Sequence, residues 1–115
     1  MGVTIYHNPH CSKSRQALQL LRERQVEPDI VEYLETPPSA RELGALLDML
    51  GLEPRELMRR KEAEYRELGL EDPRLTRAEL IRAMIEHPKL IERPVVVKDG
   101  VAALGRPPER ILDLF

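Results

Sequence analysis

Residues 6–15 read Tyr-His-Asn-Pro-His-Cys-Ser-Lys-Ser-Arg, and the predicted fold is built outward from this stretch. An alternating apolar segment, Val3-Thr4-Ile5-Tyr6, precedes it and predicts a strand. Apolar residues at helical spacing, Leu18 and Leu21, follow it and predict a helix. Cys11 is therefore expected at the point where a strand ends and a helix begins.

This position favours a reactive thiolate at Cys11. The N-terminus of a helix carries roughly half a positive charge, which lowers the pKa of a thiol and offers free amide groups to an oxyanion. His7, His10, Lys13 and Arg15 place further basic side chains nearby. The alternative is a small buried apolar residue, a common role for a free cysteine. The polar and basic neighbours favour the reactive role.

The composition indicates a single folded domain. The chain has 115 residues, a net charge of −2 and 42% hydrophobic residues, which allows one modest core. The small net charge provides no broad basic field for nucleic acid or an acidic membrane. The one cysteine cannot form an internal disulfide, and we find neither a signal peptide nor an apolar run of membrane-spanning length. We expect a cytosolic protein with no nucleic-acid or membrane partner.

The two ends of the chain predict an α/β fold. A strand at residues 2–6, a helix at 12–24 and a strand at 29–34 form a βαβ unit, which is right-handed if the strands are parallel. Near the C-terminus, the β-branched residues 95–97 and the turn pair Asp99-Gly100 predict a hairpin. Its second strand is expected at residues 101–104, and a last helix at Ile111, Leu112 and Phe115.

Residues 39–88 predict a helical insert between these two parts. Ser39 and Glu42 match a capping box, and so do Thr76 and Glu79. Each pair precedes apolar residues at helical spacing, while residues 62–75 show few such residues and predict irregular structure. Without the insert, the chain predicts a four-stranded mixed sheet with two helices, the pattern of a thioredoxin- or glutaredoxin-like fold. We expect residues 1–115 to form one domain.

Three functional motifs to which Cys11 could belong are absent. Ser14 stands where a Cys-x-x-Cys redox pair would have its second cysteine, so any redox turnover needs a thiol from another molecule. Ala17 stands where a Cys-x5-Arg phosphatase loop would have its arginine. His7, His10 and Cys11 lack a fourth ligand at the spacing of a structural zinc site, and no metal site is predicted.

Three arginines, Arg59, Arg93 and Arg106, lie at breaks in the predicted elements. Guanidinium groups bind tetrahedral oxyanions in a bidentate manner. Each arginine taken alone is more often a solvated surface charge. Arg93 and Arg106 are the better candidates, because in a thioredoxin-like fold the residue before Pro94 lies beside the cysteine loop.

Several blocks of the sequence resemble the glutaredoxin-coupled arsenate reductases. The resemblance runs from residue 3 to the C-terminus, and the chain is most similar to the short chromosomal members, which share its Cys-Ser-Lys-Ser-Arg segment at residues 11–15. The blocks are Ile5–Cys11, Tyr33–Pro38, Glu67–Leu70, His87–Pro94 and Gly105–Pro108.

The resemblance implies a mechanism and a set of residues. Cys11 attacks arsenate as a thiolate and forms a thioarsenate; glutathione is the co-substrate, and glutaredoxin reduces the resulting mixed disulfide. Arg59, Arg93 and Arg106 correspond to the oxyanion-binding arginines, and His7 to the histidine that helps keep the cysteine ionised. The proline after the second arginine, Pro94, is implied to be cis, and Ser14 is expected to support the site. No metal or bound organic cofactor is implied.

Two other functions stay open. The first is a glutathione-dependent thiol reductase that acts on a substrate other than arsenate. The second is a regulator of the Spx type, which binds RNA polymerase. Regulators of that type usually carry a Cys-x-x-Cys pair and lack the complete arginine set, so the sequence favours an enzyme.

Overall fold

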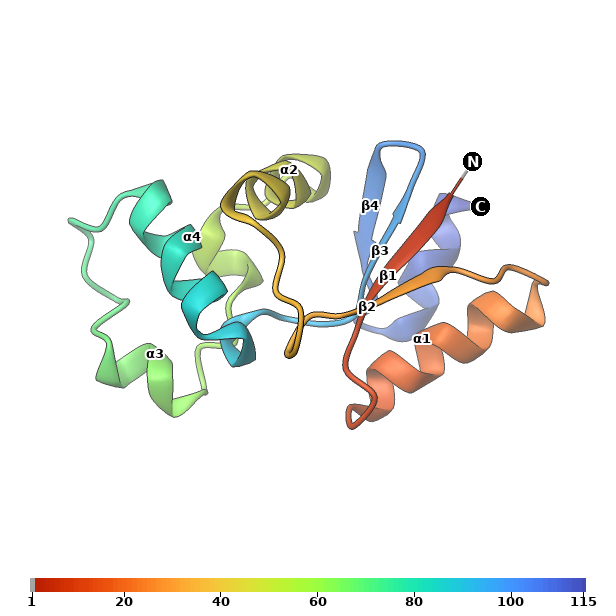
Figure 1. Cartoon of the computed structure of the whole chain (residues 1–115), viewed down its shortest axis with the longest axis horizontal. Coiled ribbons are helices and arrows are strands. Elements are labelled where there is room, and N and C mark those ends of the chain that lie inside the picture. The colour runs from red at the N-terminus through yellow and green to blue at the C-terminus, as the bar shows by residue number, and fades with distance from the viewer. Residues whose placement is uncertain (1) are drawn as a thin grey trace. The chain divides into compact units, whose positions relative to one another are not determined.

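The computed structural model describes residues 2–115 (Figure 1). The strands are β1 (Val3–His7), β2 (Asp29–Glu32), β3 (Val95–Lys98) and β4 (Val101–Leu104). The α-helices are α1 (Ser12–Glu23), α2 (Ala40–Leu50), α3 (Ala63–Glu67) and α4 (Arg77–Glu86). Short 3₁₀ helices are η1 (Pro54–Leu57), η2 (Pro88–Leu90) and η3 (Pro108–Leu114). The chain forms two compact units, of which the second is Pro37–Glu92 and the first contains the remaining residues.

The first unit is built on a four-stranded mixed sheet, as the sequence predicts. The strand order is β2-β1-β3-β4. β1 pairs with β2 in parallel and with β3 antiparallel, and β3 pairs antiparallel with β4. Ile5 in the middle of β1 lies opposite Ile30 on one side and Val96 on the other. The sheet and its βαβ unit have the thioredoxin-like arrangement.

Helix α1 and the C-terminal helix η3 complete this unit. They pack against each other, and α1 also contacts β1 while η3 contacts β3 and β4. Burying each aliphatic side chain contributes about 1.5–3 kcal/mol, so this cluster fixes α1 against the sheet. Its buried members are Ile5, Ala17, Leu18, Leu21, Val96 and Ile111.

The second unit is helical, and its two longest helices begin as the sequence predicts. Ser39 forms a capping box with Glu42, and Thr76 forms one with Glu79. The four hydrogen bonds are 2.9–3.2 Å long. Gly51 ends α2 in the left-handed conformation (φ 68°), which glycine adopts without a steric cost. α2 packs against α4. The buried residues of the two helices are Leu43, Leu46, Leu47, Leu80, Ile81 and Met84.

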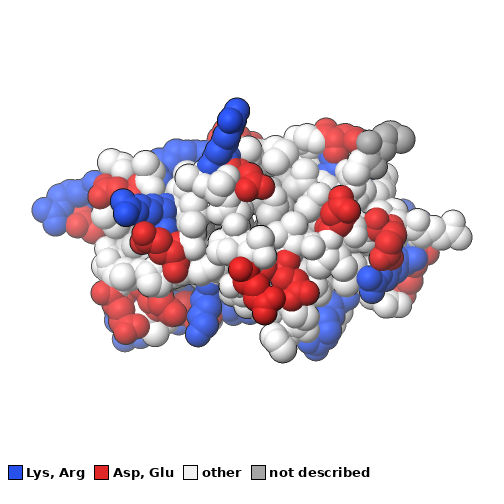
Figure 2. Space-filling view, in the orientation of Figure 1, with Lys and Arg blue, Asp and Glu red and all other residues white. Residues whose placement is uncertain are grey.

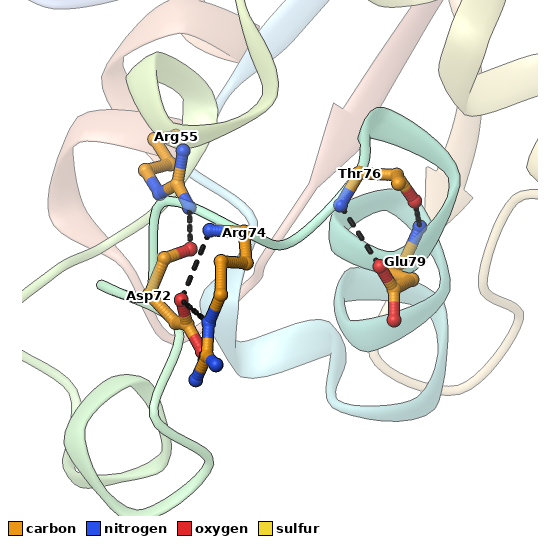
Figure 3. A network of polar contacts seen from close by, with 5 residues as sticks. All are labelled: Arg55, Asp72, Arg74, Thr76 and Glu79. Atoms are coloured by element: carbon orange, nitrogen blue, oxygen red, sulfur yellow. Dashed lines mark hydrogen bonds and ion pairs between the residues drawn. The ribbon is translucent and has the colours of Figure 1, made fainter.

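The segment between α3 and α4 is held by Arg55, as Figure 3 shows. The Arg55 guanidinium donates to the backbone oxygens of Leu70 (2.9 Å) and Asp72 (2.6 Å). The Asp72 carboxylate accepts from the backbone and the guanidinium of Arg74. The two Arg55 bonds tie backbone carbonyl groups of this irregular segment to η1, so this arginine has a structural role.

Four details differ from the sequence prediction. Residues 63–67 form helix α3 where irregular structure was expected, and buried Tyr65 ties this short helix to the unit. β2 ends at Glu32, two residues early, because the chain turns there: the Glu32 carbonyl accepts from the backbone of Glu35 and Thr36. The C-terminal helix has 3₁₀ geometry. The Arg106–Pro107 peptide bond is cis, which the sequence did not predict.

The visible face of the molecule carries both signs of charge. Figure 2 shows Lys and Arg side chains interspersed with Asp and Glu side chains on that face. This mixture agrees with the net charge of −2. Within residues 2–115, no helix is both long and apolar enough to cross a membrane.

Candidate active site

The sheet register brings three loops to one end of the first unit. Tyr6 near the end of β1 lies opposite Val95 at the start of β3, and Val95 lies opposite Leu104 at the end of β4. The loop after β1 carries Cys11. The segments before β3 and after β4 carry Arg93 and Arg106. Residues that are up to 95 positions apart in sequence are therefore neighbours.

Cys11 occupies the N-cap position of α1 and is partly exposed. Its side chain makes no formal capping hydrogen bond, but the backbone N–H groups of Ser14 and Lys13 approach the sulfur closely enough to affect its titration. Burial alone would raise the pKa of the Cys11 thiol. The N–H of Ser14, the guanidinium of Arg93 and the N–H of Lys13 outweigh burial and hold the pKa below its ordinary value. The site therefore favours the nucleophilic thiolate.

Two arginines contact the sulfur. Arg106 Nη2 lies 3.8 Å from Cys11 Sγ, and Arg106 Nε donates to the backbone oxygen of Arg93 (2.9 Å). The Arg93 guanidinium hydrogen-bonds to the sulfur. The Nε bond fixes the orientation of the Arg106 side chain, so that its charge is held beside the thiolate. The two guanidiniums thus place positive charge beside the cysteine loop.

His7 is buried beside Ser14, and its surroundings lower its pKa. Its side chain is 5% exposed, and its Nδ1 is hydrogen-bonded to the Oγ of fully buried Ser14. Burial lowers the pKa of His7; Glu32 acts in the opposite direction, and Arg22 and Arg15 lower the pKa further. A lowered pKa favours the neutral form of a histidine ring. Burial therefore disfavours the positive charge that the sequence suggested for His7, and its role in keeping Cys11 ionised stays a prediction.

Ser14 and Asn8 fix the shape of the cysteine loop. The Ser14 Oγ accepts from the backbone N–H of Asn8 (3.1 Å) in addition to its bond with His7. The Asn8 carbonyl accepts from the N–H of Cys11 (3.0 Å), and its Oδ1 accepts from the N–H of His10 (3.0 Å). Asn8 was not among the predicted site residues. The Asn-Pro pair at residues 8–9, which is typical of turns, is the signal that points to it.

Pro94 and Gly105 join the two arginine segments. The Arg93–Pro94 peptide bond is cis, the geometry that the resemblance implies. The Gly105 N–H donates to the Pro94 carbonyl (2.8 Å). A Cβ at Gly105 would lie 2.8 Å from Pro94 Cγ and 3.3 Å from Ile111 Cγ2. Only glycine allows the chain to pass this closely to Pro94 just before Arg106.

Arg59 belongs to the second unit, where it forms two ion pairs. Arg59 Nη1 lies 2.9 Å from Glu62 Oε1, and Arg59 Nε lies 3.6 Å from Glu92 Oε1. Its backbone N–H donates to the Leu90 carbonyl (2.7 Å). These contacts fix the position of Arg59 within its own unit. Its role in oxyanion binding stays a prediction.

We expect the low pKa of Cys11 to appear in its alkylation rate. Only the thiolate reacts, so the rate with iodoacetamide should rise with pH through a midpoint below the ~8.5 of an unperturbed thiol. Arg93→Ala should move this midpoint upward, because it removes a hydrogen bond and a positive charge from the sulfur. Mass spectrometry of the alkylated chain across a pH series measures the rate.

Arg22→Ala is the matched control for this titration, since Arg22 is exposed and pairs with Glu27. A midpoint at or above that of free glutathione, or equal midpoints for Arg93→Ala and the unmodified protein, would contradict the assignment of the thiolate to this environment.

No metal cluster accompanies the cysteine in the part of the chain that the structure describes. Among residues 2–115, no three His, Cys, Asp or Glu side chains lie together as a group that could hold a metal ion.

The chain matches a known protein family. The model of the ArsC family matches residues 6–114. The chain belongs to the ArsC family. ArsC relatives include an arsenate reductase of Neisseria meningitidis, which is 50% identical over 95% of this chain and 94% of its own length. An uncharacterized protein of Escherichia coli K12, YfgD, is 56% identical over 97% of this chain and 95% of its own length.

A solved ArsC structure also matches over the full chain. An arsenate reductase from Vibrio cholerae superposes with a TM-score of 0.97 and is 53% identical, covering 100% of this chain and 98% of its own. The ArsC fold thus extends over both compact units.

Proposed function

We propose that the chain is an arsenate reductase in which Cys11 is the nucleophile. The observation that carries the proposal is the sulfur itself, which has a lowered pKa and is contacted by the guanidiniums of Arg93 and Arg106. A thiolate beside two cations suits attack on an oxyanion, because the cations attract the substrate and offset the negative charge of the nucleophile. Further support comes from relatives named arsenate reductase.

The reaction proceeds in three chemical steps. The Cys11 thiolate attacks arsenic(V), and one arsenate hydroxyl takes up a proton and leaves as water, which gives a covalent Cys11 thioarsenate. A glutathione thiol then attacks the Cys11 sulfur, the sulfur–arsenic bond breaks, and its electron pair reduces arsenic(V) to arsenic(III), which leaves as arsenite. A glutaredoxin thiolate then attacks the glutathione sulfur of the remaining Cys11–glutathione disulfide, which forms a glutaredoxin–glutathione disulfide and releases the Cys11 thiolate.

The arginines bind the substrate and stabilise its developing charge. Arsenate is largely a dianion near neutral pH, and the forked guanidinium matches its oxygens. Arg106 and Arg93 are assigned to this role on their contacts with Cys11. Arg59 is included as the third arginine because of the family resemblance alone.

The reducing equivalents come from outside the chain. The sequence contains one cysteine, so no second thiol of the same chain can resolve the intermediate. We therefore assign glutathione as co-substrate and glutaredoxin as protein partner, with no bound organic cofactor or metal. A free thiol that cycles with glutathione requires a reducing compartment, and we place the reaction in the cytosol.

A coupled turnover assay tests the proposal. Arsenate, glutathione, glutaredoxin and a reductase for oxidised glutathione are combined with the protein, and arsenite release is followed together with NADPH consumption. Turnover with arsenate that depends on both thiols is expected. Phosphate and sulfate, which also bind guanidinium groups, should inhibit without being consumed. Absence of arsenite formation, or equal thiol consumption with other anions, would contradict arsenate as the substrate.

A further inference from the structure

A groove runs along the exposed face of α1 toward the start of η3 in the first unit. It is lined by Ser12, Arg15, Gln16, Gln19 and Leu20 of α1 and by Glu109 of η3, and it holds about 580 Å³. This volume lies in the range of about 300–1,000 Å³ that small-molecule sites occupy. We call it the α1–η3 groove. The proposed reaction, as described above, assigns no task to it.

The groove begins beside the reactive cysteine. Ser12 is the residue after Cys11, and Glu109 is the third residue after Arg106. Adjacent Cα atoms are about 3.8 Å apart, so one end of the groove lies next to the residue that carries the sulfur. A molecule whose thiol reaches Cys11 from the Ser12 side can extend one arm of its chain into the groove.

The groove is long enough for one arm of glutathione, which carries its thiol on the central one of its three residues. Its α1 residues occur at i, i+3, i+4, i+7 and i+8 from Ser12, which places them in one stripe on a helix. From Ser12 to Gln19 this stripe rises about 10 Å, at roughly 1.5 Å per residue. The γ-glutamyl arm, which carries both an ammonium group and a carboxylate, is about two extended peptide residues long, roughly 7 Å, and fits within this rise.

The chemistry of the groove matches a peptide that carries charges of both signs. Arg15 offers a guanidinium to a carboxylate, and its Nη1 is already bound to the Pro9 carbonyl (2.9 Å), which restricts the side chain. Glu109 offers a carboxylate to an ammonium group. Gln16 and Gln19 offer amides that pair with peptide groups. Glutathione carries two carboxylates, one ammonium group and two amides, and it is small enough to satisfy all of these groups.

We propose that the α1–η3 groove binds the peptide body of glutathione and directs its thiol toward Cys11. This proposal rests on the proposed function, since it assigns a binding site to the thiol co-substrate of that reaction. Such a groove would bind glutathione and not small thiols, because small thiols have no peptide groups to occupy it. The proposal also predicts that the charge on Glu109 matters for glutathione and not for arsenate.

Kinetics of two groove variants test the proposal. Glu109→Gln and Gln19→Ala should each raise the KM for glutathione, by about tenfold for the lost charged partner and about fivefold for the lost amide. The rate with 2-mercaptoethanol in place of glutathione and the formation of the Cys11–arsenate adduct should not change. Glu35→Gln, at an exposed position of the same unit outside the groove, should match the unmodified protein.

Equal effects with glutathione and 2-mercaptoethanol would overturn the proposal. So would a raised KM for glutaredoxin with an unchanged KM for glutathione, which would make the groove a protein contact.

A binding measurement separates this inference from the proposed function. S-methylglutathione, which cannot form a disulfide, is titrated into the ¹⁵N-labelled protein. Saturable shifts of the Gln16 and Gln19 side-chain amides, weakened in Glu109→Gln, support the groove even if arsenate is never reduced. Shifts absent from α1 and η3 at millimolar S-methylglutathione would overturn it, while formation of the arsenate adduct would leave the proposed function standing.

Discussion

Replacing Cys11 by Ser is expected to abolish arsenite release, with a loss of at least about 10³-fold in kcat, in line with nucleophile replacement in other enzymes. The serine hydroxyl stays protonated at neutral pH, and a Ser–arsenate ester would leave no sulfur for glutathione to attack. The coupled assay measures the loss, and intact-mass analysis should show no covalent adduct.

The control for this variant is the binding of oxyanion. Arg93 and Arg106 remain in place in Cys11→Ser, so arsenate and sulfate should still bind, as measured by calorimetry. Circular dichroism should match that of the unmodified protein, because the side chain is partly exposed and lies outside the buried cluster of the first unit. Arsenite release near the normal rate would remove Cys11 from the mechanism.

Replacing Arg106 by Ala is expected to lower kcat/KM for arsenate by roughly 10²–10³-fold, about 2.7–4 kcal/mol, as the loss of a preorganised oxyanion donor does elsewhere. Arg106 is held by the Arg93 carbonyl at 2.9 Å and lies 3.8 Å from the sulfur. Its loss removes both a substrate contact and the charge beside the thiolate. Arg106→Lys should recover only part of the activity, since an ammonium group keeps the charge and loses the fork.

Arg22→Ala provides the comparison for Arg106→Ala. The Arg22 side chain is 47% exposed, and its 3.0 Å ion pair with Glu27 lies on the surface. Such pairs contribute about 0–1 kcal/mol, so this variant should keep nearly full activity. Similar losses in the two variants would show that general charge, rather than the position of Arg106, governs the rate.

The fold was predictable from the sequence where local rules and the tertiary structure agree. The capping boxes at Ser39 and Thr76 and the hairpin turn at Asp99-Gly100 have side chains or backbone geometry that specify an element by themselves. Helix α3 was missed because its five residues, Ala63–Glu67, carry almost no periodic apolar pattern and depend on the burial of Tyr65. Short elements that tertiary contacts stabilise leave little signal in the sequence.

The candidate site was predictable in its residue types and less so in its electrostatics. Cys11 at the start of α1 follows from the strand-to-helix switch, and the approach of Arg93 and Arg106 follows from the order of β1, β3 and β4. The lowered pKa of His7 could not be read from the sequence, because it depends on burial of the ring. The position of Arg59 depends on its carboxylate partners, Glu62 and Glu92, which also give no local signal.

The close packing at Gly105 has a consequence for how this catalyst tolerates change. A single added methyl group there would meet Pro94 at 2.8 Å and Ile111 at 3.3 Å, so the backbone would have to shift just before Arg106. Such a protein would keep every charged group of its active centre and still be a poor enzyme. Variation that retunes the reaction is better tolerated along the solvent face of α1 than in the strand that carries Arg106 into place.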